Sequence, residues 1–240
     1  MKRLFPLAIA LTLFTACGDD DQGPSGPVID ENGNLNIIAS DSIIIGSSQI
    51  LNDINVNGAI TITESSTIGN NLNINEGGRV YIQMNTPTDT LWVDGDMNIN
   101  HQLEIRNGTV LLTGNLNNNS DGQVLIADAL YIGGDVNNNN ILTQSADTLS
   151  IEGTLNNNSG GYIYSTSVIE VGKDLNNNDI FEISGGTLSV GGDMNNNGGA
   201  NFSTNNTTFI RGNLMNSGTI SGCNLINVEG ENNACSGLEE

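Results

Sequence analysis

Few side chains in this 240-residue sequence could do covalent chemistry. It has one histidine, His101, and three cysteines, Cys17, Cys223 and Cys235. A nucleophilic hydrolase needs a serine or cysteine beside a general base, and His101 is far from every cysteine in the sequence. No phosphate-binding glycine loop and no metal-ligand spacing occurs either. The residue inventory therefore predicts that the protein is not an enzyme and needs no organic cofactor.

The two C-terminal cysteines are placed to form a disulfide. Cys223 and Cys235 form an even pair, and in an exported protein such a pair favours a disulfide. Closing a loop of about 13 residues would stabilise the fold by about 3 kcal/mol in the entropic description. Zinc binding is not expected, because the only histidine is distant.

Two aspartates could bind a cation. Asp174 and Asp193 occupy the same position in successive copies of a sequence repeat. If the copies stack, the two backbones lie about 4.8 Å apart. Such a pair of carboxylates favours a structural Ca²⁺, or else a raised pKa for one of them. Calcium at Asp174 and Asp193 is the single metal site that the sequence suggests.

The repeat that positions these residues has a period of 19 or 20 residues. Its copies share a polar residue that we call the anchor. The clear anchors are Asp96, Asn115, Asp135, Thr154, Asp174, Asp193 and Asn213, with weaker copies at Asn34, Asp53, Asn71 and Glu231. Aliphatic residues recur five and three positions before the anchor and one after it, which places them on one face of an extended strand. Glycine precedes the anchor in six of the seven clear copies, and Lys173 is the exception.

The third position after the anchor changes character along the chain. It holds Ile or Val in the early copies and then asparagine in six later ones, at Asn118, Asn138, Asn157, Asn177, Asn196 and Asn216. An exchange of aliphatic residues for asparagine at one inward position predicts a buried ladder, in which each amide donates to the next along the stack. The alternative is that these asparagines lie in solvated turns.

A fixed period of this length indicates one supersecondary unit stacked on copies of itself. Asn and Gly are too frequent, and Ala and Leu too scattered, for a helix in each copy. We therefore predict an all-β fold: a single-stranded parallel β-helix, or β-solenoid, of about eleven coils, right-handed and roughly 50 Å long. Each coil should hold two or three short strands. A longer step between Asn71 and Asp96 predicts an inserted loop at 84–90.

One outward position carries large apolar residues in three successive copies. Trp92, Leu111 and Tyr131 should form an exposed stripe about 10 Å long, which is typical of a surface that binds sugar or protein. The alternative is that the inserted loop at 84–90 folds over the stripe and covers it.

The N-terminus reads as an export signal. Lys2 and Arg3 precede an apolar run too short to span a bilayer, so residues 1–16 are expected to be a signal peptide. Cys17 follows Phe-Thr-Ala, which resembles a bacterial lipobox and implies cleavage before Cys17 and lipidation of its thiol. Ordinary secretion with cleavage after Ala16 is the alternative.

The residues after Cys17 bear on location. The cluster Asp19-Asp20-Asp21 resembles the export signal of Bacteroidetes surface lipoproteins, which implies an outer-membrane lipoprotein that faces the cell exterior. The alternative is a solvated acidic tether. Residues 17–28 then form a lipid-anchored acidic and Gly/Pro linker, and residues 29–240 form the β-solenoid with a disulfide-pinned C-terminal coil.

Charge narrows the choice of partners. Removal of the signal leaves four basic against 27 acidic residues, a net charge of about −23. Nucleic acid and anionic lipid surfaces are poor partners for such a field, whereas cations or a cationic surface suit it. The simpler use of the charge is solubility and protection of sheet edges from aggregation.

A last resemblance concerns assembly. The phrase Val-Gly-Gly-Asp-Met-Asn-Asn-Asn-Gly at 190–198, with its relatives between 91 and 216, resembles the polymer-forming bactofilin-like solenoids. That resemblance implies a β-solenoid and end-to-end association, which Cys223, Cys235 and the acidic tail would discourage at the C-terminal end.

Three functions are therefore weighed from the sequence. We expect a non-enzymatic, lipid-anchored surface protein that acts as a spacer, adhesin or envelope component, anchored in the outer membrane through its N-terminal lipid. The alternative is a module that binds a polysaccharide or partner protein through Trp92, Leu111 and Tyr131. A polysaccharide lyase ranks third, because β-helical lyases carry long loops and more basic residues.

Overall fold

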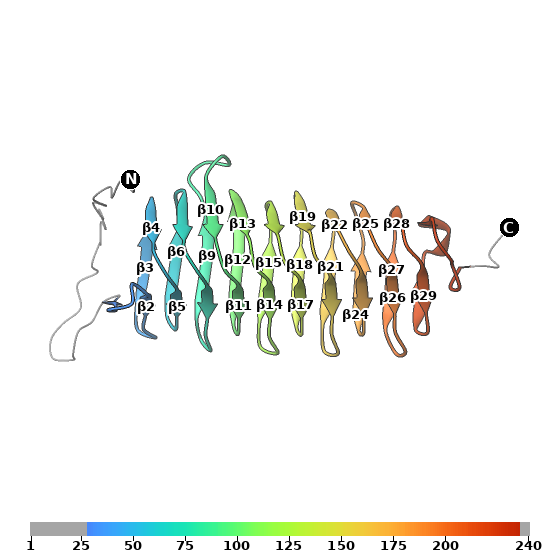
Figure 1. Cartoon of the computed structure of the whole chain (residues 1–240), viewed down its shortest axis with the longest axis horizontal. Coiled ribbons are helices and arrows are strands. Elements are labelled where there is room, and N and C mark those ends of the chain that lie inside the picture. Colours follow the sequence, from blue (N-terminus) through green and yellow to red (C-terminus); the bar gives the residue numbers. More distant parts are fainter. Residues whose placement is uncertain (1–27, 236–240) are drawn as a thin grey trace, which may run out of the picture.

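The computed structural model describes residues 28–235, which form a rod of short stacked strands (Figure 1). The strands are two to six residues long. The one helical element in this range is a short 3₁₀ turn, η1, at Cys223–Leu225. The expected signal peptide (1–16), Cys17 and nearly all of the linker (17–28) lie outside the described residues.

The strands form three long sheets, and each sheet takes one strand from every turn. Sheet A contains β1 (Val28–Ile29), β2 (Leu35–Ile37), β5 (Ile54–Val56), β8 (Leu72–Ile74), β11 (Met97–Ile99), β14 (Leu116–Asn118), β17 (Val136–Asn138), β20 (Leu155–Asn157), β23 (Leu175–Asn177), β26 (Met194–Asn196) and β29 (Leu214–Asn216). Sheet B contains β3 (Ser42–Ile45), β6 (Ala59–Ile62), β9 (Arg79–Gln83), β12 (Gln102–Asn107), β15 (Gln123–Ile126), β18 (Ile141–Gln144), β21 (Tyr162–Ser165), β24 (Ile180–Ile183), β27 (Asn201–Thr204) and β30 (Thr219–Ser221). Sheet C contains β4 (Ser48–Ile50), β7 (Ser66–Ile68), β10 (Thr90–Val93), β13 (Thr109–Leu112), β16 (Leu130–Ile132), β19 (Thr148–Ile151), β22 (Val168–Val171), β25 (Leu188–Val190), β28 (Thr208–Ile210) and β31 (Ile226–Val228).

The predicted single-stranded parallel β-helix is confirmed. Equivalent residues of successive turns pair in register, as Leu155 pairs with Leu175, and β1 with β2 is the one antiparallel pair among the described strands. Each turn holds three strands, the upper of the two numbers expected. The right-handed winding stays a prediction.

The rod has about ten turns, not eleven. Sheet A has a parallel strand after each anchor from Asn34 to Asn213, but the block at Glu231 contributes only a bridge between Leu214 and Asn232. In the last turn the chain departs from the regular coil at Gly222, whose positive φ of 87° leads into the 3₁₀ turn η1, and it rejoins sheet C as β31. An eleventh copy is therefore recognisable in sequence without forming a complete coil.

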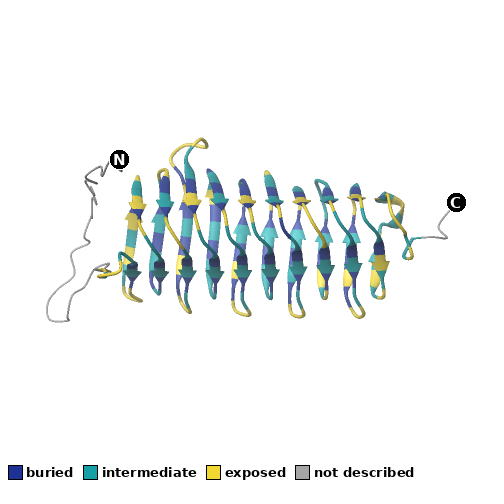
Figure 2. Ribbon diagram, viewed as in Figure 1, coloured by how far each residue is buried: buried dark blue, intermediate teal, exposed yellow. Residues whose placement is uncertain are grey.

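Side chains alternate between interior and surface along the strands (Figure 2). Apart from the terminal β29, the three-residue strands of sheet A bury their first and last residues and turn the middle one outward, as in Leu72–Ile74. Phe181 and Phe202 fill the interior near the C-terminal end and meet edge to face, with ring centroids 5.7 Å apart. Each fully buried aliphatic or aromatic side chain contributes roughly 1.5–3 kcal/mol to the stability of the fold. Together these side chains form one core that runs the whole length of the rod.

The predicted asparagine ladder is confirmed, and the solvated-turn alternative is wrong. The Nδ2 atoms of Asn118, Asn138, Asn157, Asn177 and Asn196 each donate to Oδ1 of the next asparagine, ending on Asn216, at 2.7–2.8 Å. The first five side chains are at most 1% exposed. The amide groups also donate to backbone carbonyls, as Asn157 does to Ile180 at 2.9 Å. The interior can hold these polar groups because nearly every one is hydrogen-bonded.

The ladder has one unsatisfied end. Every amide donates towards the C-terminus, so the first member needs a donor from the preceding turn. That turn offers Ile99, which pairs with Asn118 across sheet A. The Oδ1 atom of Asn118 is accordingly buried without a hydrogen-bond partner. The change from aliphatic to amide side chains therefore leaves one orphan acceptor.

The inserted loop at 84–90 joins β9 to β10 and projects beyond the other turns (Figure 1). Met84 is buried and fixes one end of the loop. Asp89 accepts hydrogen bonds from the backbone N–H and the hydroxyl of Thr86 and from the hydroxyl of Ser65. These bonds lower the pKa of Asp89, with the Thr86 hydroxyl as the largest cause.

The predicted disulfide is confirmed. Cys223 and Cys235 are bonded, with their Cα atoms 5.5 Å apart. The bridge joins η1, within the last turn, to the segment that follows β31. It lies at the C-terminal end, where Cys235 packs against the hydrophobic core.

The position of an asparagine in the ladder should decide what its replacement costs. Asn118→Ile moves the unpaired amide oxygen at the start of the ladder one turn along, to Asn138, and still leaves only one such oxygen. Asn157→Ile interrupts the ladder and leaves a second unpaired amide oxygen, at Asn177. It should therefore destabilise the fold by about 1–3 kcal/mol more than Asn118→Ile does. Asn157→Asp should cost most, because a buried carboxylate would face the Asn177 Oδ1 and the Ile180 carbonyl oxygen. Denaturant midpoints followed by circular dichroism give the order, and equal midpoints for all three variants would contradict the ladder.

Candidate functional site

Asp174 and Asp193 stand at equivalent positions before β23 and β26, and their side chains have a structural use. Oδ1 of Asp174 accepts the backbone N–H of Asp193 at 2.8 Å, and Oδ1 of Asp193 accepts that of Asn213 at 2.7 Å. The same contact is made by Asn34, Asp53, Asn71, Asp96, Asn115, Asp135 and Asn213. Between residues 28 and 235 no group of three or more His, Cys, Asp or Glu side chains is placed to hold a metal. Calcium at Asp174 and Asp193 stays a prediction.

This contact also explains the glycine before the anchor. The anchor's Oδ1 atom lies against the glycine of the next turn: a Cβ on Gly95 would come within 2.5 Å of Oδ1 of Asn71. The same crowding recurs at Gly114, Gly134, Gly153, Gly192, Gly212 and Gly230. Lys173, the exception noted in the sequence, follows the turn whose anchor is Thr154. Threonine has no Oδ1 atom, so the position after it has room for a side chain.

A second asparagine ladder runs along the surface of sheet A, and the sequence analysis missed it. It consists of Asn36, Asn55, Asn73, Asn98, Asn117, Asn137, Asn156, Asn176 and Asn195. Each Nδ2 donates to Oδ1 of the preceding member at 2.8–3.1 Å. Its signal was visible: asparagine fills the second position after the anchor in every turn from β2 to β26, although that position points outward.

The Trp92 stripe lies where the sequence placed it. Trp92, Leu111 and Tyr131 are neighbours in register on β10, β13 and β16, on the outer face of sheet C. Trp92 is 46% exposed and Tyr131 41%. The loop at 84–90 therefore does not cover them, and that alternative is wrong. The stripe ends at Thr67 on one side and Ser150 on the other.

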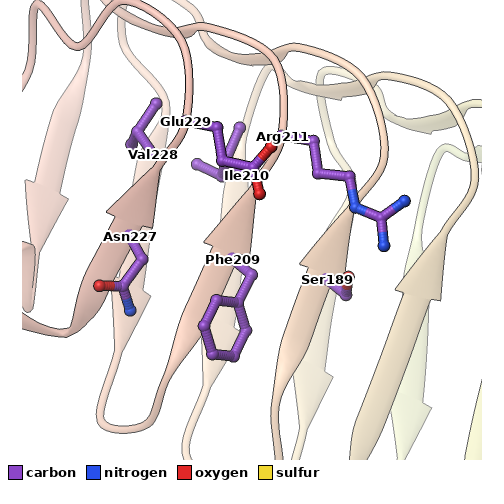
Figure 3. A pocket seen from close by; sticks show the side chains of 7 residues that line it. All are labelled: Ser189, Phe209, Ile210, Arg211, Asn227, Val228 and Glu229. Atoms are coloured by element: carbon purple, nitrogen blue, oxygen red, sulfur yellow. The ribbon is translucent and has the colours of Figure 1, made fainter.

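A third exposed aromatic lies on the same outward column, and its surroundings were not foreseen. Phe209 on β28 is 49% exposed. It lines a hollow of about 500 Å³ together with Ser189, Ile210, Arg211, Asn227, Val228 and Glu229. Figure 3 shows Ser189, Phe209 and Asn227 on three neighbouring strands, with the Arg211 side chain extending towards the strand of Ser189. Phe209 was visible in the sequence, but the hollow is formed by residues from three turns.

On sheet B, two groups of polar side chains are already paired with one another. Arg106 binds Glu104 at 2.8 Å, and its guanidinium carbon lies 5.3 Å from the ring centroid of Tyr81. Burial raises the pKa of Tyr162, and the nearby Glu182 carboxylate, 3.4 Å from its hydroxyl, adds to that effect. These groups hold one another and offer less to a ligand than the hollow at Phe209.

Comparison with known proteins gives no relative. The chain matches no protein-family model, no curated protein and no solved structure. The resemblances to Bacteroidetes surface lipoproteins and to bactofilins therefore stay predictions, and only the predicted β-solenoid fold is established. Within the described range no helix is long and apolar enough to cross a membrane.

The contact between anchor and glycine predicts a sharp difference between two alanine variants. Gly134→Ala should destabilise by about 1–3 kcal/mol, because the new methyl group would collide with Oδ1 of Asn115 and the carbonyl of Gly114. Lys173→Ala is the matched control at the same position of a later turn, and its thermal midpoint should match that of the wild type. A Gly134→Ala protein as stable as the control would show that the contact does not restrict this position.

Proposed function

We propose that this protein is a non-enzymatic, lipid-anchored rod that serves at the cell surface as a spacer, adhesin or structural component of the envelope. One observation carries the proposal: ten in-register turns share a continuous core, and ladders of amide hydrogen bonds run from Asn36 to Asn195 at the surface and from Asn118 to Asn216 inside. At about 4.8 Å per turn the rod is about 45 Å long. Sheets A to C run the whole way without a break, so the unit is suited to holding two points apart.

The direction of the rod fits an N-terminal anchor. The first turn, with β2, and the last sheet A strand, β29, lie at opposite ends of the long axis (Figure 1). Cys17 precedes β1 (Val28–Ile29) by eleven positions, a length that suits a short tether. A lipid on Cys17 would leave the C-terminal turns and the Cys223–Cys235 bridge farthest from the membrane.

The charge argues against nucleic acid as a partner. With about −23 charges in the mature chain, the rod repels phosphate backbones and anionic lipid headgroups. The same repulsion disfavours side-by-side association of copies at low salt. Oligomeric state, including the end-to-end stacking implied by the bactofilin resemblance, is outside this proposal.

The binding of a polysaccharide or partner protein through the Trp92 stripe is the second candidate. Its supporting observation is that Trp92, Leu111 and Tyr131 form a continuous apolar strip over three successive turns, and that two of the three are more than 40% exposed. Aromatic rings at such exposure are common anchors in interfaces. This role is compatible with a rod that displays the strip on its side.

Lipidation is the first test of the proposal. In a Gram-negative host, the wild-type protein should incorporate labelled palmitate and fractionate with membranes, whereas Cys17→Ser should do neither. The double variant Cys223→Ser/Cys235→Ser is the control and should keep its label, because the two cysteines that it lacks are remote from the lipobox. Unlabelled, soluble wild-type protein cut after Ala16 would support plain secretion instead and would contradict the anchor.

The stripe can be tested through its own tryptophan. Trp92 is the only tryptophan in the chain, so intrinsic fluorescence reports on that position alone. If the stripe binds a glycan, that glycan should shift or quench the emission of the Cys17→Ser mature chain. Tyr131→Ser should weaken the response roughly tenfold, because serine already occupies the next position of the column, at Ser150. A flat response across a broad panel of glycans would remove this candidate.

A further inference from the structure

We infer that the hollow around Phe209 is a binding site for a neutral sugar unit, at the end of the rod opposite the expected lipid anchor. Neither the rod function nor the Trp92 stripe requires this site. It is built by the last three strands of sheet C, which are β25, β28 and β31.

The floor of the site is an uncovered aromatic ring. Phe209 pairs in register with Ser189 on one side and Asn227 on the other, and both neighbours are smaller than the ring. The ring therefore stands 49% exposed between two polar side chains (Figure 3). An aromatic face with hydrogen-bonding groups at its border suits a ligand that is apolar on one face and polar at its edge.

The border carries one cation and one anion. Arg211 and Glu229 follow β28 and β31 at the same position of successive turns, and each donates its backbone N–H to the turn before. The preceding turn has Gly191 at this position, so the Arg211 side chain has open space ahead of it (Figure 3). Among residues 28–235 the one ion pair within 4.0 Å is Arg106 with Glu104, so the Arg211 guanidinium is not taken up by a carboxylate.

Opposite charges on one border select for a ligand without net charge. A carboxylate ligand would be drawn to Arg211 and repelled by Glu229, and an ammonium ligand would meet the reverse. Hydroxyl groups donate and accept, so adjacent hydroxyls can satisfy the guanidinium and the carboxylate together. Asn227 and Ser189 add an amide and a hydroxyl of the same mixed character. A pyranose ring has this combination of an apolar face and an edge of hydroxyls.

The size of the hollow agrees with this assignment. Its volume of about 500 Å³ lies in the range of small-molecule sites, about 300–1,000 Å³. The site is also separate from the Trp92 stripe. Six strand spacings lie between β10 and β28 in sheet C, about 29 Å. Sugar bound at Phe209 should leave the emission of Trp92 unchanged, so the two sites can succeed or fail independently.

The test is saturation-transfer NMR on the full mature chain carrying Cys17→Ser. The probes are methyl hexopyranosides and neutral β-linked disaccharides, compared with a methyl glucuronide and with glucosamine. The protein should transfer saturation to at least one neutral glycoside, with the strongest signals from ring protons on one face. The glucuronide and glucosamine should bind about tenfold more weakly than that glycoside or not at all.

Two variants in the hollow and one control variant elsewhere test whether the sugar binds at this site. Phe209→Ser copies Ser189 of the preceding turn, and Arg211→Gln keeps hydrogen bonding without charge; each should weaken binding roughly tenfold or more. Ile44→Thr, which copies Thr61 of the next turn on sheet B and lies outside both the hollow and the Trp92 stripe, should bind as the wild type does. Circular dichroism and thermal melts check that each variant folds. No neutral glycoside binding to the wild type, a preference for the uronate, or binding that survives in both folded hollow variants would overturn the inference.

Discussion

The structure depends on one constraint: each side chain lies one strand spacing from its own equivalent in the next turn. A residue is tolerated at a position only if it can lie about 4.8 Å from the residue that occupies the same position in the next turn. Aliphatic residues meet this condition by packing. Asparagine meets it because one amide both donates and accepts, so a column of asparagines satisfies itself. A column of buried aspartates would be a column of like charges, and none occurs among the buried columns.

The two full asparagine ladders run in opposite directions, and this decides what their ends need. Inner amides donate towards the C-terminus, so the inner ladder begins with an acceptor, Oδ1 of Asn118, that has no donor. Outer amides donate towards the N-terminus, so the outer ladder begins with a donor, Nδ2 of Asn36, which bonds Asp30 at 3.2 Å. The pKa of Asp30 is lowered chiefly by its bond from the Asn34 backbone N–H, with smaller contributions that include Asn36. An exposed end can thus be closed by a carboxylate, whereas the buried end stays open.

The identity of the side chain can change from turn to turn mainly in the outward columns of sheets B and C. The interior is fixed by packing, sheet A by its ladders, and the corner before sheet A by the contact between anchor and glycine. Along the outward column of sheet C the side chain changes from turn to turn, and two clusters of large residues emerge, at Trp92 to Tyr131 and at Phe209. In such a rod, a binding site can be added at a chosen turn without disturbing the fold.

The sequence by itself determined which residues are equivalent. Its period gave the solenoid, the inward columns, the buried asparagines from Asn118 to Asn216 and the pairing of Cys223 with Cys235, because each follows from spacing and side-chain chemistry alone. The outer ladder could also have been read, since asparagine recurs at one outward position. The tertiary structure decided the rest. It set three strands in each turn, ten complete turns, a loop at 84–90 that leaves Trp92 exposed, and a hollow shared by Phe209, Arg211 and Glu229. Periodicity states which side chains stack, but the bends at the corners decide which faces form and which side chains from different turns come together.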